Sequence, residues 1–330
     1  MKVLLIGATG LLGHNVLQRL TDHGHEVVAL VRHSNALCIK TPGTVLVEGN
    51  ATQLETLSAA AKGCDAIVNC AGVTDMSLLS RDDYTEVNVT LCGDIVSVMN
   101  THGIRRLVHV STVNTIGYGD ADHPADEHMT IKPPFDKSYY ADSKLCGEKI
   151  VRAAAAGNPD WHVVVVNPGY MIGPMDVKPS SGRMLLMGYR KPLMFAPRGG
   201  KSFVDVRDVA AAVVNALTMG RSGDRYIAVN SAEQFPISQL YRRQATVMGY
   251  RQVVLSLPNV LLSVAGRVGD TLRLLGVRTE LSTRNVRQLM VREYYDNSHA
   301  VSELHMPLTP IDHSIRDFYA WRKSQPETKK

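Results

Sequence analysis

The sequence lacks the features that mark a disulfide-rich, metal-binding or secreted protein. No Cys-x-x-Cys pair occurs among its five cysteines, which are Cys38, Cys64, Cys70, Cys92 and Cys146. An odd number of scattered cysteines predicts free thiols in a reducing compartment rather than disulfides or a zinc site. No cluster of His, Asp and Glu has the spacing of metal ligands, so we expect no metal.

Long apolar runs are also missing. Gly7 cuts the apolar N-terminal run after Ile6, so this run is too short for a signal peptide. Nowhere is an uninterrupted apolar stretch long enough to span a bilayer. The 36 basic and 31 acidic residues are scattered without a Lys/Arg block, which argues against nucleic acid as a partner. We therefore expect a cytoplasmic protein that acts on a small molecule and has no integral membrane segment.

What the sequence does contain is an alternation of short apolar runs and helical patterns. Apolar runs cover residues 2–7, 26–31, 44–47, 66–69, 106–110 and 163–166, and helical patterns cover 11–23 and 84–102. Continuous apolar runs are typical of parallel strands that are covered by helices on both faces. The order predicts an α/β fold, a Rossmann-type doubly wound parallel sheet.

The alternation of apolar runs and helical patterns ends after Pro168, where glycines and prolines indicate a loop-rich region. A helix is expected again at 206–217 and a strand at 226–229. From about Pro236 the pattern is mostly helical, and residues 325–330 are expected to fray. The predicted domains are a dinucleotide-binding domain at 1–168, to which 203–230 return, and a smaller, mostly helical substrate lobe at 169–202 and 231–330.

A glycine-rich turn follows the first apolar run. Gly7, Gly10 and Gly13 recur at three-residue intervals between the expected strand and a helix that opens at Leu11. Glycines let a pyrophosphate approach the helix N-terminus, where free N–H groups and the helix dipole stabilise negative charge. The position of the turn within a strand–helix–strand unit predicts a bound nicotinamide dinucleotide. The alternative is a glycine-rich turn without a ligand.

The end of the second apolar run bears on which dinucleotide binds. NAD sites usually place Asp or Glu there to bond the ribose hydroxyls, but this chain has Arg32. A guanidinium suits a 2′-phosphate, so NADP is the preferred cofactor and NAD the alternative. Lys40 lies nearby in the sequence and could assist. The other interpretation of Arg32 is an ordinary surface residue.

Tyr140 and Lys144 lie four residues apart, which places them on one face of a helix. An ammonium near a phenol lowers the tyrosine pKa, so Tyr140 is a candidate general acid and base for a carbonyl or carbinol oxygen. Ser111 and Thr112 follow the fifth apolar run, where a hydroxyl can stabilise charge that develops on a substrate oxygen. The spacing alone also fits an exposed helix pair, and the hydroxyls alone also fit capping residues.

Together these motifs resemble the extended short-chain dehydrogenase/reductase family, which is part of the NAD-dependent epimerase/dehydratase superfamily. Further segments agree along nearly the whole chain: Gly49–Thr52 near an adenine, Asn69–Gly72 after the fourth run, Val87–Val89, Asn167–Pro174 beside a nicotinamide, and Phe203–Val209. Asn50 replaces the usual Asp of one of these motifs, and Asn167 replaces the usual Arg of another.

The resemblance implies a catalytic triad of Thr112, Tyr140 and Lys144, in which Tyr140 handles the proton and Thr112 orients the substrate oxygen. It also implies that the cofactor contacts Gly7, Thr9, Gly10, Leu11, Leu12, Gly13, Arg32, Asn50, Ala51, Cys70, Ala71, Gly72, Asn88, Ser111, Tyr140, Lys144, Pro168 and Met171. Members of the family commonly pair through the helix after the fourth strand and the helix that carries Tyr140 and Lys144, so a homodimer is expected.

The subgroup decides the expected reaction. Val113-Asn114 stands where dehydratases carry an Asp-Glu pair, which argues against a dehydratase. Segments 173–183 and 294–300 resemble dihydroflavonol-reductase-like and 3β-hydroxysteroid-dehydrogenase-like members, and the substrate lobe is rich in Met and Leu. We expect an NAD(P)-dependent oxidoreductase that transfers hydride between the nicotinamide and a ketone, aldehyde or secondary alcohol of a fairly apolar substrate. The alternatives are a nucleotide-sugar epimerase with tightly bound NAD and a non-catalytic dinucleotide sensor.

Residues 258–277 form an amphipathic helical pattern with Arg267 and Arg273. Such a helix covers an apolar substrate as a lid, contacts a membrane surface, or packs on the C-terminal lobe. Packing is favoured, because helices of globular proteins commonly have this pattern.

Overall fold

The computed structural model describes residues 1–39 and 41–325. Lys40 and residues 326–330 lie outside the described residues. The predictions that Lys40 assists a 2′-phosphate and that these last residues fray therefore stay predictions.

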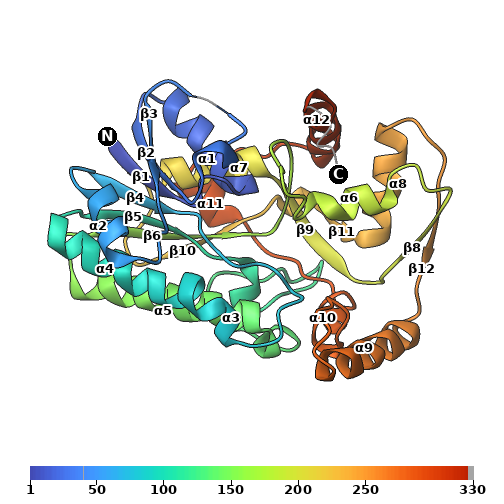
Figure 1. Cartoon of the computed structure of the whole chain (residues 1–330). Helices are drawn as coiled ribbons and strands as arrows, with labels where there is room; N and C mark the ends of the chain where they lie inside the picture. Colours follow the sequence, from blue (N-terminus) through green and yellow to red (C-terminus); the bar gives the residue numbers. More distant parts are fainter. Residues whose placement is uncertain (40, 326–330) are drawn as a thin grey trace.

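A seven-stranded parallel sheet forms the centre of the molecule, in the order β10-β6-β5-β4-β1-β2-β3 (Figure 1). Its strands are β1 (Lys2–Ile6), β2 (Glu26–Val31), β3 (Thr44–Glu48), β4 (Ala66–Asn69), β5 (Arg106–Val110), β6 (His162–Pro168) and β10 (Arg225–Ala228). The predicted Rossmann-type doubly wound α/β fold is confirmed. The strand order reverses between β1 and β4, and ligands of such sheets bind at this switch point, outside the carboxyl ends of the strands.

Helices cover both faces of the sheet because its strands are apolar on both faces. On one face Val3 and Leu5 pack with α1 (Leu11–Asp22) and α7 (Val206–Asn215). On the other face Leu4 and Ile6 belong to the core beneath α2 (Leu54–Ala61), α4 (Leu91–His102) and α5 (Tyr139–Gly157). The single helix expected over 84–102 is instead α3 (Asp82–Thr85), a π-helical turn (Glu86–Thr90) and α4 in direct succession.

The second part of the molecule is mostly helical, as predicted. Its helices are α6 (Gly182–Gly188), α8 (Ile237–Val247), α9 (Asn259–Leu274), α10 (Thr283–Gln288), α11 (Ser298–Glu303) and α12 (Ile311–Ser324). A three-stranded sheet holds β7 (Tyr170–Ile172), β9 (Gly200–Asp205) and β11 (Gln234–Pro236), and β8 (Leu193–Ala196) pairs with β12 (Val253–Ser256). The division of the chain into two domains at the residues given above stays a prediction.

The strands of this part were not predicted. Residues 169–202 were expected to be irregular, yet β7, β8 and the start of β9 lie there, and β12 interrupts the expected helical stretch. Each of these strands has three to six residues. Runs this short show too few periods to separate a strand from a loop by pattern alone. Within residues 1–39 and 41–325, no helix combines the length and the apolar character that crossing a bilayer requires.

One glycine lets α5 approach the π-helical turn closely. A Cβ atom at Gly147 would lie 2.2 Å from the Asn88 carbonyl oxygen and 2.8 Å from Cys92 Sγ. These distances are shorter than any van der Waals contact, so only glycine fits without a shift of the backbone. The close approach sets the distance between α5, which carries Tyr140 and Lys144, and the turn that carries Asn88.

Substitution Gly147→Ala should therefore destabilise the protein by about 2 kcal/mol, because the added methyl group overpacks a helix interface. Urea unfolding measures the change. The matched control is Gly93→Ala in α4, where an added Cβ meets nothing within 4 Å. It should stabilise the protein by about 0.5–1 kcal/mol through helix propensity. Equal effects of the two substitutions would contradict the proposed close approach.

Candidate active site

The glycine-rich turn lies at the switch point of the sheet, between β1 and α1. Gly7 has a φ of +83°, and a Cβ on it would lie 2.6 Å from the Ala71 nitrogen. A Cβ on Gly13 would lie 2.0 Å from the Gly7 carbonyl oxygen. The fold itself therefore requires both glycines, one for a left-handed turn against the end of β4 and one for packing of α1 against β1.

Gly10 has a different reason to be glycine. Its φ is −85°, it is exposed, and a Cβ there would meet only the Gly7 oxygen at an ordinary 3.5 Å. Apart from its chain neighbours, no other atom of residues 1–39 and 41–325 lies within 4 Å of that position. Gly10 caps α1, whose first N–H groups have no partners within the helix. The turn thus has an open, donor-rich surface of the kind that fits the pyrophosphate of a dinucleotide.

The ends of several strands converge beside this turn. Gly72, after β4, is exposed, and a Cβ on it would lie 3.6 Å from Lys144 Nζ of α5 and 3.5 Å from Asn88 Oδ1. Lys144 Nζ donates to the carbonyl oxygen of Val110 at the end of β5, with a distance of 2.6 Å. The structure thus brings residues from β1, β4, β5 and α5 together at one edge of the sheet.

Asn88 holds this edge in place through three hydrogen bonds. Its side chain accepts from the Val73 nitrogen (2.8 Å) and donates to the Val73 oxygen (3.1 Å) and to Ser143 Oγ (2.9 Å). The bonds join the π-helical turn to the loop after β4 and to α5. A π-helical turn often occurs where a side chain must be aimed away from the regular helical direction. Since Asn88 is buried, its contacts here are internal, and a contact with the cofactor stays a prediction.

Tyr140 and Lys144 lie on consecutive turns of α5. The helix begins at Tyr139 because Ser138 caps it, with the Ala141 nitrogen donating to Ser138 Oγ (3.4 Å). Burial raises the pKa of Tyr140, and an interaction with the Thr112 side chain partly offsets this rise. Burial also lowers the pKa of Lys144.

The Tyr–Lys spacing predicted a lowered pKa for Tyr140. In the structure its pKa is raised instead. The ammonium of Lys144 is held by the Val110 carbonyl group, and desolvation dominates at the phenol. Tyr140 is a neutral phenol at neutral pH, with its hydroxyl group next to Thr112. A neutral phenol can donate a proton to an acceptor oxygen.

Sequence reasoning missed Glu148, one helical turn beyond Lys144. Its side chain is 1% exposed, and its Oε2 accepts from Ser111 Oγ (2.9 Å), Thr115 Oγ1 (3.0 Å) and Asn167 Nδ2 (3.1 Å). The guanidinium of Arg225 on β10 pairs with Oε1 at 3.1 Å. Asn167 also donates to the Thr112 carbonyl oxygen (3.0 Å), so this network fixes the backbone that carries Thr112.

Two observations change the sequence interpretation of this region. The Ser111 hydroxyl donates to Glu148, which gives it a positioning role, and its contact with the cofactor stays a prediction. Asn167, which replaces the usual Arg, is a buried member of the Glu148 network. The repeat of four residues from Tyr140 to Lys144 to Glu148 was the available signal, because it places all three on one helix face.

The other predicted cofactor residues lie along the same edge of the sheet. Leu12 and Pro168 are buried, whereas Thr9, Leu11, Ala51, Cys70, Ala71 and Met171 are partly exposed and Asn50 is exposed. Burial raises the pKa of Cys70 to about 12, so it is a thiol and not a thiolate. The ends of β2 and β3 are joined by the Gly49 nitrogen, which donates to the Val31 oxygen (2.8 Å). Among the described residues, no hydrogen bond or ion pair joins Arg32, Asn50 or Ala51 to Thr112, Tyr140 or Lys144.

Arg32 is exposed just beyond the end of β2. Within residues 1–39 and 41–325 its guanidinium takes part in no hydrogen bond or ion pair. The nearby carboxylate of Glu48 is used by the backbone, since the Ser34 nitrogen donates to it at 3.3 Å. Arg32 is therefore available to an anionic group at this end of the site.

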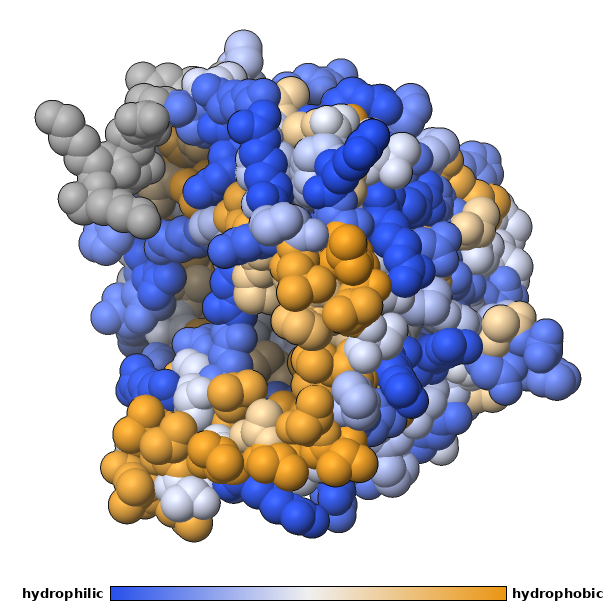
Figure 2. Space-filling view, turned by 90° about the vertical axis from the view of Figure 1, so that its right-hand side faces the viewer, coloured by the Kyte–Doolittle hydropathy of each residue, from blue (hydrophilic) through white to orange (hydrophobic). Residues whose placement is uncertain are grey.

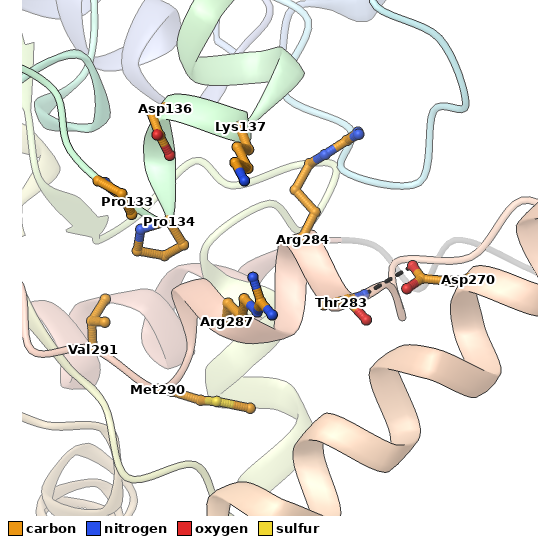
Figure 3. A pocket seen from close by; sticks show the side chains of 10 residues that line it. All are labelled: Pro133, Pro134, Asp136, Lys137, Asp270, Thr283, Arg284, Arg287, Met290 and Val291. Carbon is orange, nitrogen blue, oxygen red and sulfur yellow. Dashed lines mark hydrogen bonds between the residues drawn. The ribbon is translucent and has the colours of Figure 1, made fainter.

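A cavity of about 540 Å³ lies between the loop before α5 and helices α9 and α10 (Figure 3). Its walls carry apolar groups from Pro133, Pro134, Met290 and Val291, and the cations Lys137, Arg284 and Arg287. Arg284 also lies over the ring of Tyr139, 3.6 Å from its centroid. The cavity thus borders the start of α5, although neither Tyr140 nor Thr112 lines it.

Met and Leu side chains that suggested an apolar substrate site mostly form a core. Leu185 is fully buried, and Met184 and Leu186 pack against the same cluster with Phe203 and Phe318. Met194 belongs to a neighbouring cluster. Their abundance therefore says little about the substrate.

Comparisons with known proteins agree with the geometry. The model of the NAD dependent epimerase/dehydratase family matches residues 3–232. A putative dihydroflavonol 4-reductase of Synechocystis sp. is 30% identical, over 96% of this chain and 92% of that protein. Sterol demethylase protein B of Methylococcus capsulatus is 27% identical, over 97% of this chain and 98% of that protein. The structure of UDP-glucose 4-epimerase with UDP-glucose from Thermotoga maritima has a TM-score of 0.78 at 15% identity, covering 98% of this chain and 99% of that one, which shows a shared fold.

Substitution Glu148→Gln should lower the free energy of unfolding by about 2–4 kcal/mol, because it leaves the partly buried Arg225 facing an amide instead of a carboxylate. Chemical denaturation measures the loss. Glu86→Gln, an exposed change of the same kind on the π-helical turn, should stay within about 0.5 kcal/mol of the wild type. A Glu148→Gln protein as stable as Glu86→Gln would show that the network does not hold the site together.

Proposed function

The chain belongs to the NAD dependent epimerase/dehydratase family, and from this premise we propose that it reduces a ketone or aldehyde on a fairly apolar molecule with NADPH. The reverse reaction is oxidation of the corresponding secondary alcohol. As a member of the family the protein is an NAD(P)-dependent enzyme. The main support for a reductase is the position of Thr112, Tyr140 and Lys144 near the open glycine turn, with Tyr140 in its neutral form.

The residues present divide the work as follows. The turn from Gly7 to Gly13 would hold the pyrophosphate. The Nζ atom of Lys144, which α5 places beside the ends of β4 and β5, would lie near the ribose. A bound nicotinamide supplies hydride to the substrate carbon or accepts it. The Thr112 hydroxyl orients the substrate oxygen, and the Tyr140 phenol donates its proton to that oxygen as the carbonyl group is reduced. Lys144, held by the Val110 carbonyl group, keeps a positive charge beneath the site.

An apolar substrate is supported by two observations. The cavity beside α5 presents prolines, a methionine and a valine. The two relatives compared over nearly their whole length carry the names of a reductase and of a sterol-processing protein. Arg32 supports NADP over NAD, because its free guanidinium suits a 2′-phosphate. A cytoplasmic location and a homodimer remain proposals from the sequence.

A nucleotide-sugar epimerase is the second candidate, and one observation favours it. Three cations, Lys137, Arg284 and Arg287, outnumber the two carboxylates of Asp136 and Asp270 on the cavity wall, and this excess of positive charge suits a phosphate group. An epimerase of this type would retain NAD tightly through purification. Release of NAD from the denatured, purified protein in a near-stoichiometric amount would favour this candidate, and a protein that binds NADPH reversibly would favour the reductase.

Substitution Tyr140→Phe should lower kcat/KM at least about 100-fold, because it removes the proton donor and little else. The assay is NADPH consumption over a panel of ketones, aldehydes and sugars. Tyr139→Phe is the matched control, since the ring beneath Arg284 is retained, and it should keep near wild-type turnover. Because burial raises the Tyr140 pKa above its ordinary value of 10.0, wild-type reduction should lose rate only at pH values above 10. Full activity of Tyr140→Phe would refute the assignment.

Substitution Arg32→Asp should weaken NADPH binding by about 10- to 100-fold, the value of a charge-assisted hydrogen bond. Binding of NADH should change far less. Fluorescence titration with both cofactors measures the ratio. Arg105→Asp makes the same change of charge at the opposite end of the strands, just before β5, and should affect neither cofactor. An equal loss for NADPH and NADH would remove Arg32 from the choice of cofactor.

A further inference from the structure

Helix α9 presents its apolar side to solvent and its polar side to the protein. Val260, Val264, Val268 and Leu272 recur every four residues, and Leu261 and Leu275 lie within the same stripe. Their exposed fractions range from 37% for Leu272 to 75% for Leu275. The only buried residues of the helix are Gly266 and Gly269. The helix packs against the C-terminal part of the chain, as favoured from the sequence, but it does so through its polar side, and the apolar stripe is left exposed.

Specific contacts fix this orientation. A Cβ on Gly269 would lie 2.0 Å from the Leu281 carbonyl oxygen, so the helix backbone approaches the segment before α10 closely. Asp270 Oδ1 accepts from the Thr283 nitrogen at 2.9 Å. Arg273 donates to backbone oxygens of Ser77 (3.2 Å) and Thr279 (2.8 Å) and also to that of Leu78. The apolar stripe is exposed because glycines and hydrogen bonds hold the opposite side against the protein.

The two-stranded sheet that precedes α9 in the chain also exposes apolar side chains to solvent. Strands β8 and β12 are parallel and apolar on both faces, a pattern that usually indicates cover on both sides. Val254 is buried, but the paired side chains Leu193 and Val253, and Phe195 and Leu255, are 45–58% exposed. We call the exposed side chains of α9, β8 and β12 the apolar face. Figure 2 shows hydrophobic surface gathered over this side of the molecule, down to its lower edge.

Positive charge is concentrated in the segment of the sequence that contains α9. Residues 251–292 contain seven arginines and two carboxylates, Asp270 and Glu280, which amounts to the formal +5 of the whole chain. The rest of the chain has 29 basic and 29 acidic residues and is neutral. Arg251, Arg267 and Arg278 are exposed in this segment, and Arg190 and Lys191 are exposed just before β8.

We propose that the apolar face docks on an anionic membrane surface, with α9 lying in the plane of the interface. An apolar stripe with arginines beside it is the pattern of helices that lie at the headgroup boundary and attract anionic lipids. The charge selects this occupant, since a second copy of the chain would bring the same excess of positive charge to the interface. The helices expected to pair in a homodimer, α4 and α5, lie apart from α9 in Figure 1. This proposal goes beyond the proposed function and is independent of it.

The test is co-sedimentation of the full chain with vesicles of phosphatidylcholine that contain about 30 mol % phosphatidylserine. Wild-type protein should bind these vesicles and should bind vesicles of phosphatidylcholine alone far more weakly. Val268→Glu should reduce binding at least about tenfold, because a carboxylate replaces an inserted valine. The matched control is Val45→Glu on β3, since Val45 is 58% exposed and Val268 56%. It should bind as the wild type does.

The charge is tested separately. Arg267→Gln and Arg278→Gln should each weaken binding to anionic vesicles by about fivefold. Added salt should also weaken this binding. Turnover of a water-soluble substrate should be unchanged in all these variants, which shows that they fold. The proposal is overturned if wild-type protein does not bind anionic vesicles, or if Val268→Glu and Val45→Glu bind equally. It is also overturned if Val268→Glu instead converts a dimer to a monomer in analytical ultracentrifugation, which would assign the apolar face to a second copy.

Discussion

The buried carboxylate of Glu148 is the interaction on which the geometry of the candidate site depends. It accepts hydrogen bonds from three separate parts of the chain: Ser111 and Thr115 after β5, Asn167 on β6 and Arg225 on β10. A buried charge is tolerated only where its partners are in place, so each bond also fixes the element that supplies it. The same helix carries Tyr140 and Lys144, and the Glu148 network, together with the bond from Lys144 to Val110, fixes their position relative to the end of β5.

Local requirements made part of the site predictable. The need for glycine at position 13 arises within a dozen residues, because a Cβ there would meet Gly7 and Ala8 of the same strand–turn–helix unit. The four-residue spacing of Tyr140 and Lys144 is also local. The parallel sheet was predictable because strands buried on both faces have continuous apolar runs. These features need no knowledge of distant contacts.

Features that depend on distant contacts were not predictable. Glu148 bonds residues 19 to 77 positions away, and its four-residue spacing from Lys144 gives the helix face but not these partners. The Tyr140 pKa depends on burial by other segments, which outweighed the expected effect of Lys144. The spacing of apolar residues in α9 correctly separated an apolar side from a polar side. Hydrogen bonds of Arg273 and Asp270 with distant segments determine which of these sides faces the protein.

The formal excess of positive charge lies in residues 251–292, the segment that contains α9. The field of an anionic surface attracts this segment first, so diffusing molecules turn before they touch. The encounter would then be orientation-selective, with the α9 side leading and the glycine turn and its cofactor trailing. An enzyme aligned in this way presents the same side on every collision, which shortens the search that usually limits association.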